Sequence, residues 1–223
     1  MYKAILFDID GTLVDSNDAH AHAWVEAFAE FGVHVDFNNV RRSIGMGGDK
    51  LMPAVSGISE DSSLGEKISK RRAEVFKTKY LPELQSFPGA RELAAEMKAR
   101  GLTAVAASSA KRDELEHLLQ IAGVSDLLDA ATSSDDAEES KPDPDIVHAA
   151  LKKANARPGD ALLIGDTPYD VEAAAHAGMA MIAFRCGGWG DRDLRGAIAI
   201  YDGPWDLLAG LDESALSHQR ARL

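Results

Sequence analysis

The last two thirds of the chain alternate short apolar runs with helical segments, and this alternation constrains the fold more than any other feature. After Phe87-Pro88-Gly89 we expect helices over about 89–100, 110–122, 144–155 and 168–177. The apolar runs between and after them predict strands at 102–107, near 128–132, at 161–165, at 179–184 and at 197–201. Strands that alternate with helices of this length build a mostly parallel sheet covered on both faces. The sequence therefore predicts an α/β fold with a Rossmann-like, mostly parallel core.

A further apolar run, Ala4-Ile5-Leu6-Phe7, precedes this alternation and is typical of a buried parallel strand. Asp8 and Asp10 follow it one residue apart, so strand alternation points both to the same side. A turn at Gly11 leaves them at the carboxyl end of the strand. Two carboxylates this close repel unless a cation lies between them or one is protonated. Mg2+ would relieve the repulsion and bring phosphate oxygens with it, whereas a solvated Asp-Gly turn is the simpler alternative.

Residues 16–86 have a different texture, with helical patterns and no convincing strand. Apolar residues such as Trp24 and Phe28 recur at helical spacing, and a glycine-rich loop at 45–48 interrupts the pattern. Because this block is inserted after the first strand, we expect it to form a lid over the edge where the acids lie. The predicted domains are an α/β catalytic core at 1–15 and 87–223 and a helical cap at 16–86.

Polar side chains also follow the later strands. Ser108 ends strand 102–107 and could donate to a phosphate oxygen, whereas the adjacent Ser109 is expected to cap the next helix. Lys141 lies in a loop before Pro142-Asp143-Pro144-Asp145, in which Asp143 and Pro144 are expected to cap and open a helix. The two prolines fix the local backbone, so we expect the lysine ammonium to point toward the acids and a bound phosphate.

Two more acids flank the start of the helix predicted at 168–177. Asp166 ends strand 161–165, and Asp170 lies four residues further on, on the same side. Asp170 would stabilise the first turn of that helix in any case. Asp166 comes just after the apolar run Leu162-Leu163-Ile164 and Gly165, so we expect its carboxylate to be half-buried and to need a partner. A cation shared with Asp8 and Asp10 would supply one.

The composition argues against several classes of partner. The net charge of −12 argues against nucleic acid, and no apolar stretch approaches the ~18 residues that span a bilayer. We see no secretory signal, and the single Cys186 allows no intrachain disulfide, so we expect a cytoplasmic protein without a membrane partner. The basic segment 67–79 is either a solvated helix face or a local positive field over the site. A loosely ordered tail is expected at 214–223.

The acids, serine and lysine at successive strand ends resemble the haloacid dehalogenase-like hydrolase superfamily, over nearly the whole chain. The residues that carry the resemblance are Asp8, Asp10, Ser108, Lys141, Asp166 and Asp170. The resemblance implies that Asp8 is a nucleophile that forms an aspartyl-phosphate. It implies that Asp10 is the general acid to the leaving group and then the base for the attacking water.

The same resemblance implies a phosphate site and a metal site. Ser108 and Lys141 would hold the transferring phosphoryl group. Asp8, the backbone carbonyl of Asp10, and Asp166 would hold Mg2+, and Asp170 would support the metal directly or through water. An acid at position 10 points to phosphate ester chemistry, because the dehalogenases and phosphonate-cleaving relatives lack it.

Within the superfamily the chain resembles the phosphoglycolate phosphatase and beta-phosphoglucomutase-like branch. The segment from Asp15 to Trp24 is similar to beta-phosphoglucomutase and includes a histidine, His20, at the position of its hinge histidine. Gly47-Gly48-Asp49 stands where the substrate-binding arginine of the mutase cap would be, which favours a phosphatase. His20, Gly47, Gly48 and Arg41 are the candidate substrate contacts of the cap, with Arg42 and Lys50 beside them.

These observations together predict a Mg2+-dependent phosphatase of a small phosphorylated metabolite, of the sugar phosphate or phosphoglycolate type. We expect it to act as a monomer or homodimer. A phosphomutase is the first alternative, distinguished by an isomerised product and little free phosphate. A non-catalytic phosphometabolite-binding protein is the second, although such proteins usually lack the nucleophile or a metal-binding acid, and this chain has them all.

Overall fold

The computed structural model describes residues 2–217. Its internal contacts divide the chain into two compact units, one formed by Met1–Asp15 with Gln85–Leu223 and the other by Ser16–Leu84. We call the first the core unit and the second the helical unit. Among residues 2–217, no helix combines the length and the apolar character that crossing a membrane requires.

The core unit contains a six-stranded sheet in the order β3-β2-β1-β4-β5-β6, in which every neighbouring pair is parallel. The strands are β1 Ala4–Phe7, β2 Thr103–Ala107, β3 Ala130–Thr132, β4 Ala161–Gly165, β5 Ala180–Phe184 and β6 Ala199–Tyr201. All residues of β1 and β4 are buried, as expected for apolar strands covered on both faces. The predicted α/β fold with a parallel core is confirmed.

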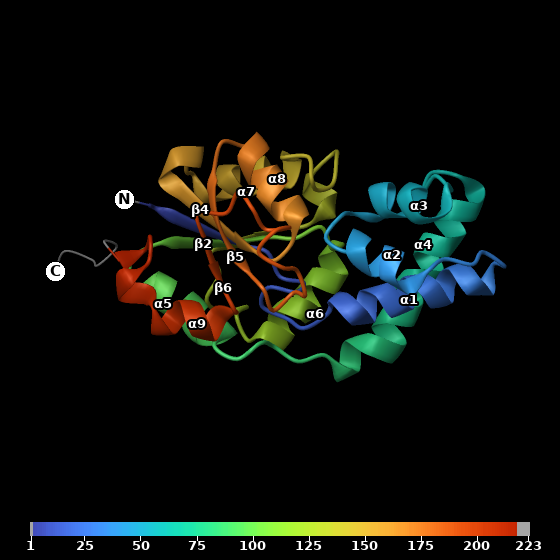
Figure 1. Cartoon of the computed structure of the whole chain (residues 1–223), viewed down its shortest axis with the longest axis horizontal. Coiled ribbons are helices and arrows are strands. Elements are labelled where there is room, and N and C mark those ends of the chain that lie inside the picture. Colours follow the sequence, from blue (N-terminus) through green and yellow to red (C-terminus); the bar gives the residue numbers. More distant parts are fainter. Residues whose placement is uncertain (1, 218–223) are drawn as a thin grey trace. The chain divides into compact units, whose positions relative to one another are not determined.

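Helices cover both faces of this sheet (Figure 1), with α7 and α8 on one side and α5 and α9 on the other. Their bounds are α5 Ala90–Ala99, α6 Arg112–Ala122, α7 Asp145–Ala154, α8 Pro168–His176 and α9 Pro204–Ala209. Alternate residues of the strands, such as Leu6 and Leu163, pack with Val147 of α7 and Ala173 of α8 in one hydrophobic cluster. Short 3-10 turns occur at Ser134–Asp136, Pro158–Asp160 and Leu211–Glu213.

Three local predictions in the core unit are wrong. Ser109 does not cap a helix, because α6 begins at Arg112 with Lys111 as its N-cap. Pro144 takes the N-cap position of α7 instead of opening it, so the helix begins one residue later than expected. At the C-terminal end, Ser214 and Leu216 are buried and the Leu216 carbonyl accepts a hydrogen bond from Arg100, so this end of the described chain is anchored to the core unit. The rest of the predicted tail, residues 218–223, lies outside the described residues.

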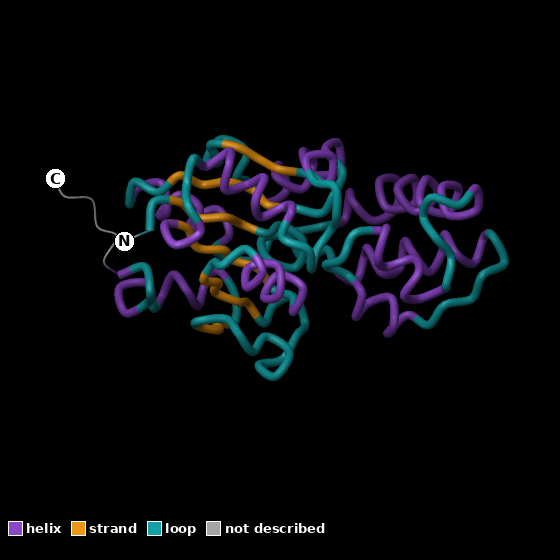
Figure 2. The backbone as a smooth tube through the Cα atoms, turned by 90° about the horizontal axis from the view of Figure 1, so that it is seen from above, coloured by secondary structure: helices purple, strands orange, loops and turns teal. Residues whose placement is uncertain are grey.

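The helical unit is built from helices and loops, without a strand among its residues (Figure 2). Its α-helices are α1 Asn17–Glu30, α2 Phe37–Ser43, α3 Gly48–Ser56 and α4 Ser63–Val75, followed by a π-helical turn at Phe76–Tyr80 and a 3-10 turn at Leu81–Glu83. Asp36 and Ser62 cap α2 and α4 by accepting hydrogen bonds from backbone amides. Trp24, Phe28 and Ile68 belong to a hydrophobic core of its own.

Candidate active site

Three neighbouring strands place polar residues at one edge of the sheet. β1 lies between β2 and β4, and Phe7 is in register with Ala106 on one side and Ile164 on the other. The residues that follow these strands, Asp8, Ser108 and Asp166, therefore meet at the carboxyl edge. The chain builds the sheet outward from β1 through β2 to β3 and then in the opposite direction from β4 to β6. Ligands of open α/β sheets bind at such a reversal of strand order.

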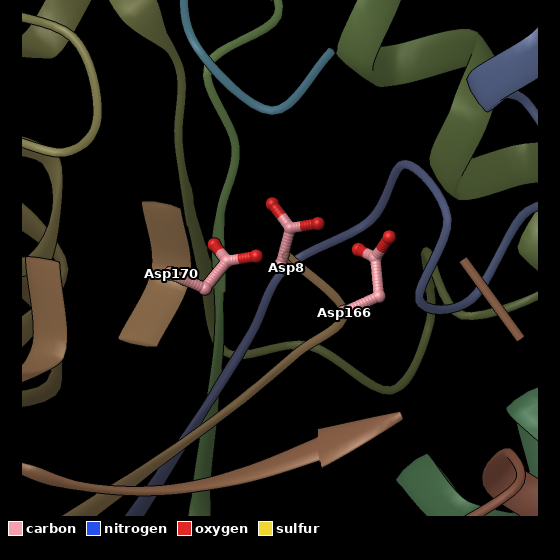
Figure 3. Close-up of side chains that lie close together, drawn as sticks. All are labelled: Asp8, Asp166 and Asp170. Atoms are coloured by element: carbon pink, nitrogen blue, oxygen red, sulfur yellow. The ribbon is translucent and has the colours of Figure 1, made fainter. Parts of the chain in front are cut away.

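Three buried carboxylates cluster at this edge (Figure 3), those of Asp8, Asp166 and Asp170. Each offers an oxygen that lies within 4.8 Å of the oxygens offered by the others. The exposed fractions are 6% for Asp8, 0% for Asp166 and 1% for Asp170. Burial raises the pKa of Asp8 above its usual range, and the nearby ammonium of Lys141 opposes that effect.

Lys141 lies among these acids with only 1% of its surface exposed. Its Nζ lies 2.6 Å from Oδ1 of Asp8 and 2.7 Å from Oδ1 of Asp170, and it donates to the carbonyl of Ala107 at 3.1 Å. Burial alone lowers the pKa of Lys141, but the two carboxylates outweigh it and raise that pKa, so the side chain is an ammonium at neutral pH. The structure thus brings Lys141 to the acids, as its sequence context predicts.

Asp170 is held by the start of α8. Its Oδ2 accepts hydrogen bonds from the backbone N–H of Thr167 at 3.0 Å and from the Thr167 hydroxyl at 2.6 Å. The N–H of Asp170 donates back to the Thr167 hydroxyl oxygen, which completes a capping box. Asp170 therefore stabilises the helix through one oxygen and holds Lys141 through the other.

Two further residues, Thr12 and Gly187, contact the acids in the structure, and neither contact is predicted from the sequence. The buried hydroxyl of Thr12 lies 2.9 Å from Oδ1 of Asp166 and 3.2 Å from Oδ2 of Asp8. Gly187 follows β5 so closely against Asp166 that a Cβ at this position would lie 1.7 Å from Oδ2 of that acid. The only available signals were the threonine after Asp-Gly and the glycine pair after Cys186.

Two predicted site residues, Asp10 and Ser108, are not members of the carboxylate cluster. Asp10 is half-buried, and its carboxylate does not belong to the group of three. Ser108 is fully buried, and its hydroxyl oxygen accepts a hydrogen bond from the backbone N–H of Ala110 at 3.0 Å. The Ser109 hydroxyl, expected to cap a helix, has no hydrogen-bond partner within residues 2–217. The catalytic role of Asp10 and the phosphate-binding role of Ser108 remain predictions.

Cys186 behaves as a packing residue. Its thiol donates to the carbonyl of Gly11 at 3.4 Å. Burial raises the pKa of this thiol far above its usual range, so it is not a nucleophilic thiolate at neutral pH.

The four candidate substrate contacts all belong to the helical unit. His20 is buried, and its ring stacks on Phe76 with 4.0 Å between the centroids. Arg41 forms an ion pair with Asp18 at 2.5 Å. Gly47 is the N-cap of α3 and Gly48 is its first residue.

The basic segment 67–79 forms ion pairs on the helical unit itself. Arg71 makes a two-pronged contact with Glu30, at 2.6 and 2.8 Å, and Lys79 lies 2.6 Å from Glu26. These pairs favour the solvated helix face over the local positive field for those two residues.

The residues at the sheet edge fit a hard divalent cation. When all four groups are ionised, three carboxylates and one ammonium carry two net negative charges in a buried place. Carboxylate oxygens are the ligands that Mg2+ prefers, and charges are stable in the interior only when they are compensated. Asp8 and Asp166 follow the neighbouring strands β1 and β4, and Asp170 also contacts Thr167 and Lys141.

The chain is similar to known proteins over most of its length. A family model described as haloacid dehalogenase-like hydrolase matches residues 5–184. The chain is 37% identical over 187 residues to Protein SUPPRESSOR OF QUENCHING 1, chloroplastic, from Arabidopsis thaliana, covering 82% of this chain but only 18% of that relative. It is 31% identical to validoxylamine A 7'-phosphate phosphatase from Streptomyces hygroscopicus subsp. limoneus, covering 80% and 84% of the two chains. It is 28% identical to phosphoglycolate phosphatase from Rhodospirillum rubrum, covering 91% and 88%.

Solved structures share the fold over nearly the full length. A hydrolase from Pseudomonas syringae superposes with a TM-score of 0.89 at 30% identity, covering 96% of this chain and 99% of the other. A protein from Bacteroides vulgatus superposes with a TM-score of 0.87 at 26% identity. Its name assigns it to the beta-phosphoglucomutases without proof of activity. That match covers 99% of this chain and 91% of the other.

Proposed function

This chain belongs to the haloacid dehalogenase-like hydrolases, and on that premise we propose that it is a Mg2+-dependent phosphatase acting through an aspartyl-phosphate intermediate. It is a phosphoric monoester hydrolase, as relatives named phosphatases indicate. The observation that carries the proposal is the buried group of Asp8, Asp166 and Asp170, of which Asp8 and Asp170 contact the ammonium of Lys141. A phosphoryl group and a divalent cation are the ligands that such a mixed cluster suits best.

In the proposed first step, an oxygen of Asp8 attacks the phosphorus atom of the ester. The Asp8–phosphorus bond forms as the bond to the ester oxygen breaks, and Asp10 gives its proton to the departing oxygen. In the second step Asp10 takes a proton from a water molecule, whose oxygen attacks the phosphorus atom as the bond between Asp8 and phosphorus breaks. Inorganic phosphate leaves, and the Asp8 carboxylate and the protonated Asp10 are restored.

Other residues of the core unit would hold the phosphoryl group during both displacements. Lys141 would offset the charge on its equatorial oxygens, and Ser108 would donate to one of them. Asp170 would keep Lys141 in place through the ion pair at 2.7 Å. When bound, Mg2+ would neutralise further phosphoryl charge, with Asp8, the backbone carbonyl of Asp10, and Asp166 as its ligands.

The substrate we propose is a small phosphorylated metabolite of the sugar phosphate or phosphoglycolate type. Two relatives bear the names of phosphatases for such compounds, one for a 7'-phosphate and one for phosphoglycolate. The helical unit would act as the specificity lid, with His20, Arg41, Gly47 and Gly48 as candidate contacts. We propose a cytoplasmic monomer or homodimer without nucleic acid or membrane partners, consistent with the net charge of −12.

The test is phosphate release from a panel of small esters, including phosphoglycolate and hexose phosphates, with Mg2+ and with EDTA. Asp8→Asn is expected to abolish turnover and keep the fold, because the amide is a poor nucleophile. Asp126→Asn is the matched control, since Asp126 is an exposed acid that pairs with Arg91. Mg2+-dependent release that Asp8→Asn removes and Asp126→Asn retains would support the proposal. Substantial turnover by Asp8→Asn would overturn the nucleophile assignment, and isomerised hexose phosphate without free phosphate would favour the mutase.

A further inference from the structure

The side chain of Thr12 contacts two of the three clustered acids, Asp8 and Asp166. It is fully buried, and it lies in the turn that follows β1. Gly11 makes this turn possible with a positive φ of 74°, and the amides of Thr12 and Leu13 close it on the carbonyl of Ile9. The backbone therefore fixes the hydroxyl at the place where the β1 and β4 acids meet.

The two contacts of the hydroxyl are unequal. A hydroxyl has one proton, so it can donate to only one carboxylate at a time. The 2.9 Å contact with Asp166 has ordinary hydrogen-bond length, whereas the 3.2 Å contact with Asp8 is long for an O–H donor. The principal bond thus ties Asp166, which follows β4, to the same loop that carries Asp8.

Each of these two acids is also fixed through its other oxygen. Lys141 contacts Oδ1 of Asp8, and the backbone at Gly187 lies against Oδ2 of Asp166. Without the hydroxyl, Oδ1 of Asp166 would lose its bond to the β1 loop, and the two like charges would face each other without the Thr12 donor.

We propose that Thr12 is a positioning residue that holds Asp8 and Asp166 in the mutual orientation required to bind a divalent cation. This inference rests on the proposed function, in which these two acids bind Mg2+. Groups that hydrogen-bond to metal-binding carboxylates orient them, and their removal typically weakens metal affinity about 10–100-fold.

The test measures metal affinity directly, so that it does not depend on turnover. Mn2+ binding to the full chain is followed by the electron paramagnetic resonance signal of free Mn2+, with Mg2+ as competitor. Thr12→Val removes the hydroxyl at nearly constant volume, and Thr12→Ser keeps it. We expect Thr12→Val to weaken Mn2+ binding by about 10-fold or more, and Thr12→Ser to restore most of the affinity.

Thr132→Val is the matched control, because Thr132 is another fully buried threonine whose hydroxyl donates to a backbone carbonyl, that of Ala106, at 2.8 Å. It should lower the melting temperature in EDTA about as much as Thr12→Val and leave Mn2+ affinity unchanged. Equal affinity losses in the two valine variants, or none in Thr12→Val, would overturn the inference. So would a wild-type chain that binds no Mn2+.

The result also separates this inference from the proposed function. Wild-type turnover with undiminished Mn2+ binding by Thr12→Val refutes only the role of Thr12. Mn2+ binding without phosphate release from any ester refutes the phosphatase, and the affinities of the variants still decide the role of Thr12.

Discussion

Replacement of Lys141 by methionine tests how the charges of the site are balanced. Lys141 is 1% exposed and contacts Asp8 and Asp170 at 2.6 and 2.7 Å. Methionine is of similar length and unbranched, so Lys141→Met removes the charge and leaves little empty volume. The variant keeps the three carboxylates in the cluster but loses the ammonium that two of them contact.

The expected loss of stability follows from these distances. At an effective dielectric constant of about 20, each contact corresponds to about 6 kcal/mol of Coulomb attraction. The cost of burying the ammonium offsets much of this, and removing one partner of a buried pair typically costs about 3–5 kcal/mol. We therefore expect the free energy of unfolding of Lys141→Met to fall by about 3–5 kcal/mol. At about 2–4 °C per kcal/mol, the melting temperature would fall by roughly 6–20 °C.

Thermal and urea denaturation in EDTA at pH 7.5 would measure this loss, with Lys153→Met as the control. Lys153 pairs with Asp136 at 2.9 Å, but its side chain is 31% exposed, so its replacement should cost only about 0–1 kcal/mol. Equal losses in the two variants would refute the reasoning.

The pH dependence separates lost charge balance from lost packing. Burial already raises the pKa of Asp8, and the Lys141 ammonium opposes that effect, so without Lys141 the pKa of Asp8 rises further above its unfolded value. A carboxyl with a raised folded-state pKa makes its contribution at low pH and loses it as the pH rises through that pKa. The deficit of Lys141→Met should therefore be smaller at pH 5 than at pH 7.5. A deficit independent of pH would point to packing instead.

Two further predictions concern other acids. Asp10→Asn should slow turnover by about 10²–10⁴-fold and leave Mn2+ affinity intact, because only the carbonyl of this residue is proposed as a ligand; weakened Mn2+ binding would contradict that division. Asp136→Asn should lower stability at pH 7 by about 0.5–2 kcal/mol, because the carboxylate accepts from the Ser133 amide and pairs with Lys153. These contacts lower the pKa of Asp136 to about 2, so their contribution is lost as the pH falls from 3.8 toward 2. The stability curves of this variant and the wild type should converge there, and a constant gap in urea titrations from pH 5 to pH 2 would refute this assignment.

The parts of the site that topology determines could be predicted from the sequence. Asp8 and Asp166 each follow an apolar run that is buried on both faces, and the carboxyl ends of parallel strands meet at one edge. Lys141 could be predicted for a different reason, because the prolines that follow it restrict the backbone of its loop.

The parts that depend on side-chain geometry could not. Ser108 and Ser109 are adjacent hydroxyls of the same type, and which of them accepts a local bond depends on the path of the chain between β2 and α6. The contact of Thr12 with Asp166 joins residues 154 positions apart, so it depends on the register of β1 with β4. A single sequence contains the residue types but not these distances.

Gly48 shows the same limit for substrate recognition. A glycine pair permits close backbone approach, so Gly47 and Gly48 are candidate substrate contacts on the sequence alone. In the helical unit the group that approaches Gly48 is an internal one, because a Cβ there would lie 2.8 Å from the carboxylate of Glu60. That carboxylate also accepts from Ser69 at 2.6 Å and lies at the start of α3, where a helix attracts negative charge. A substrate phosphate would have to displace Glu60 to bind at this helix start, so Gly48 is a weaker candidate for phosphate recognition than the core residues Ser108 and Lys141.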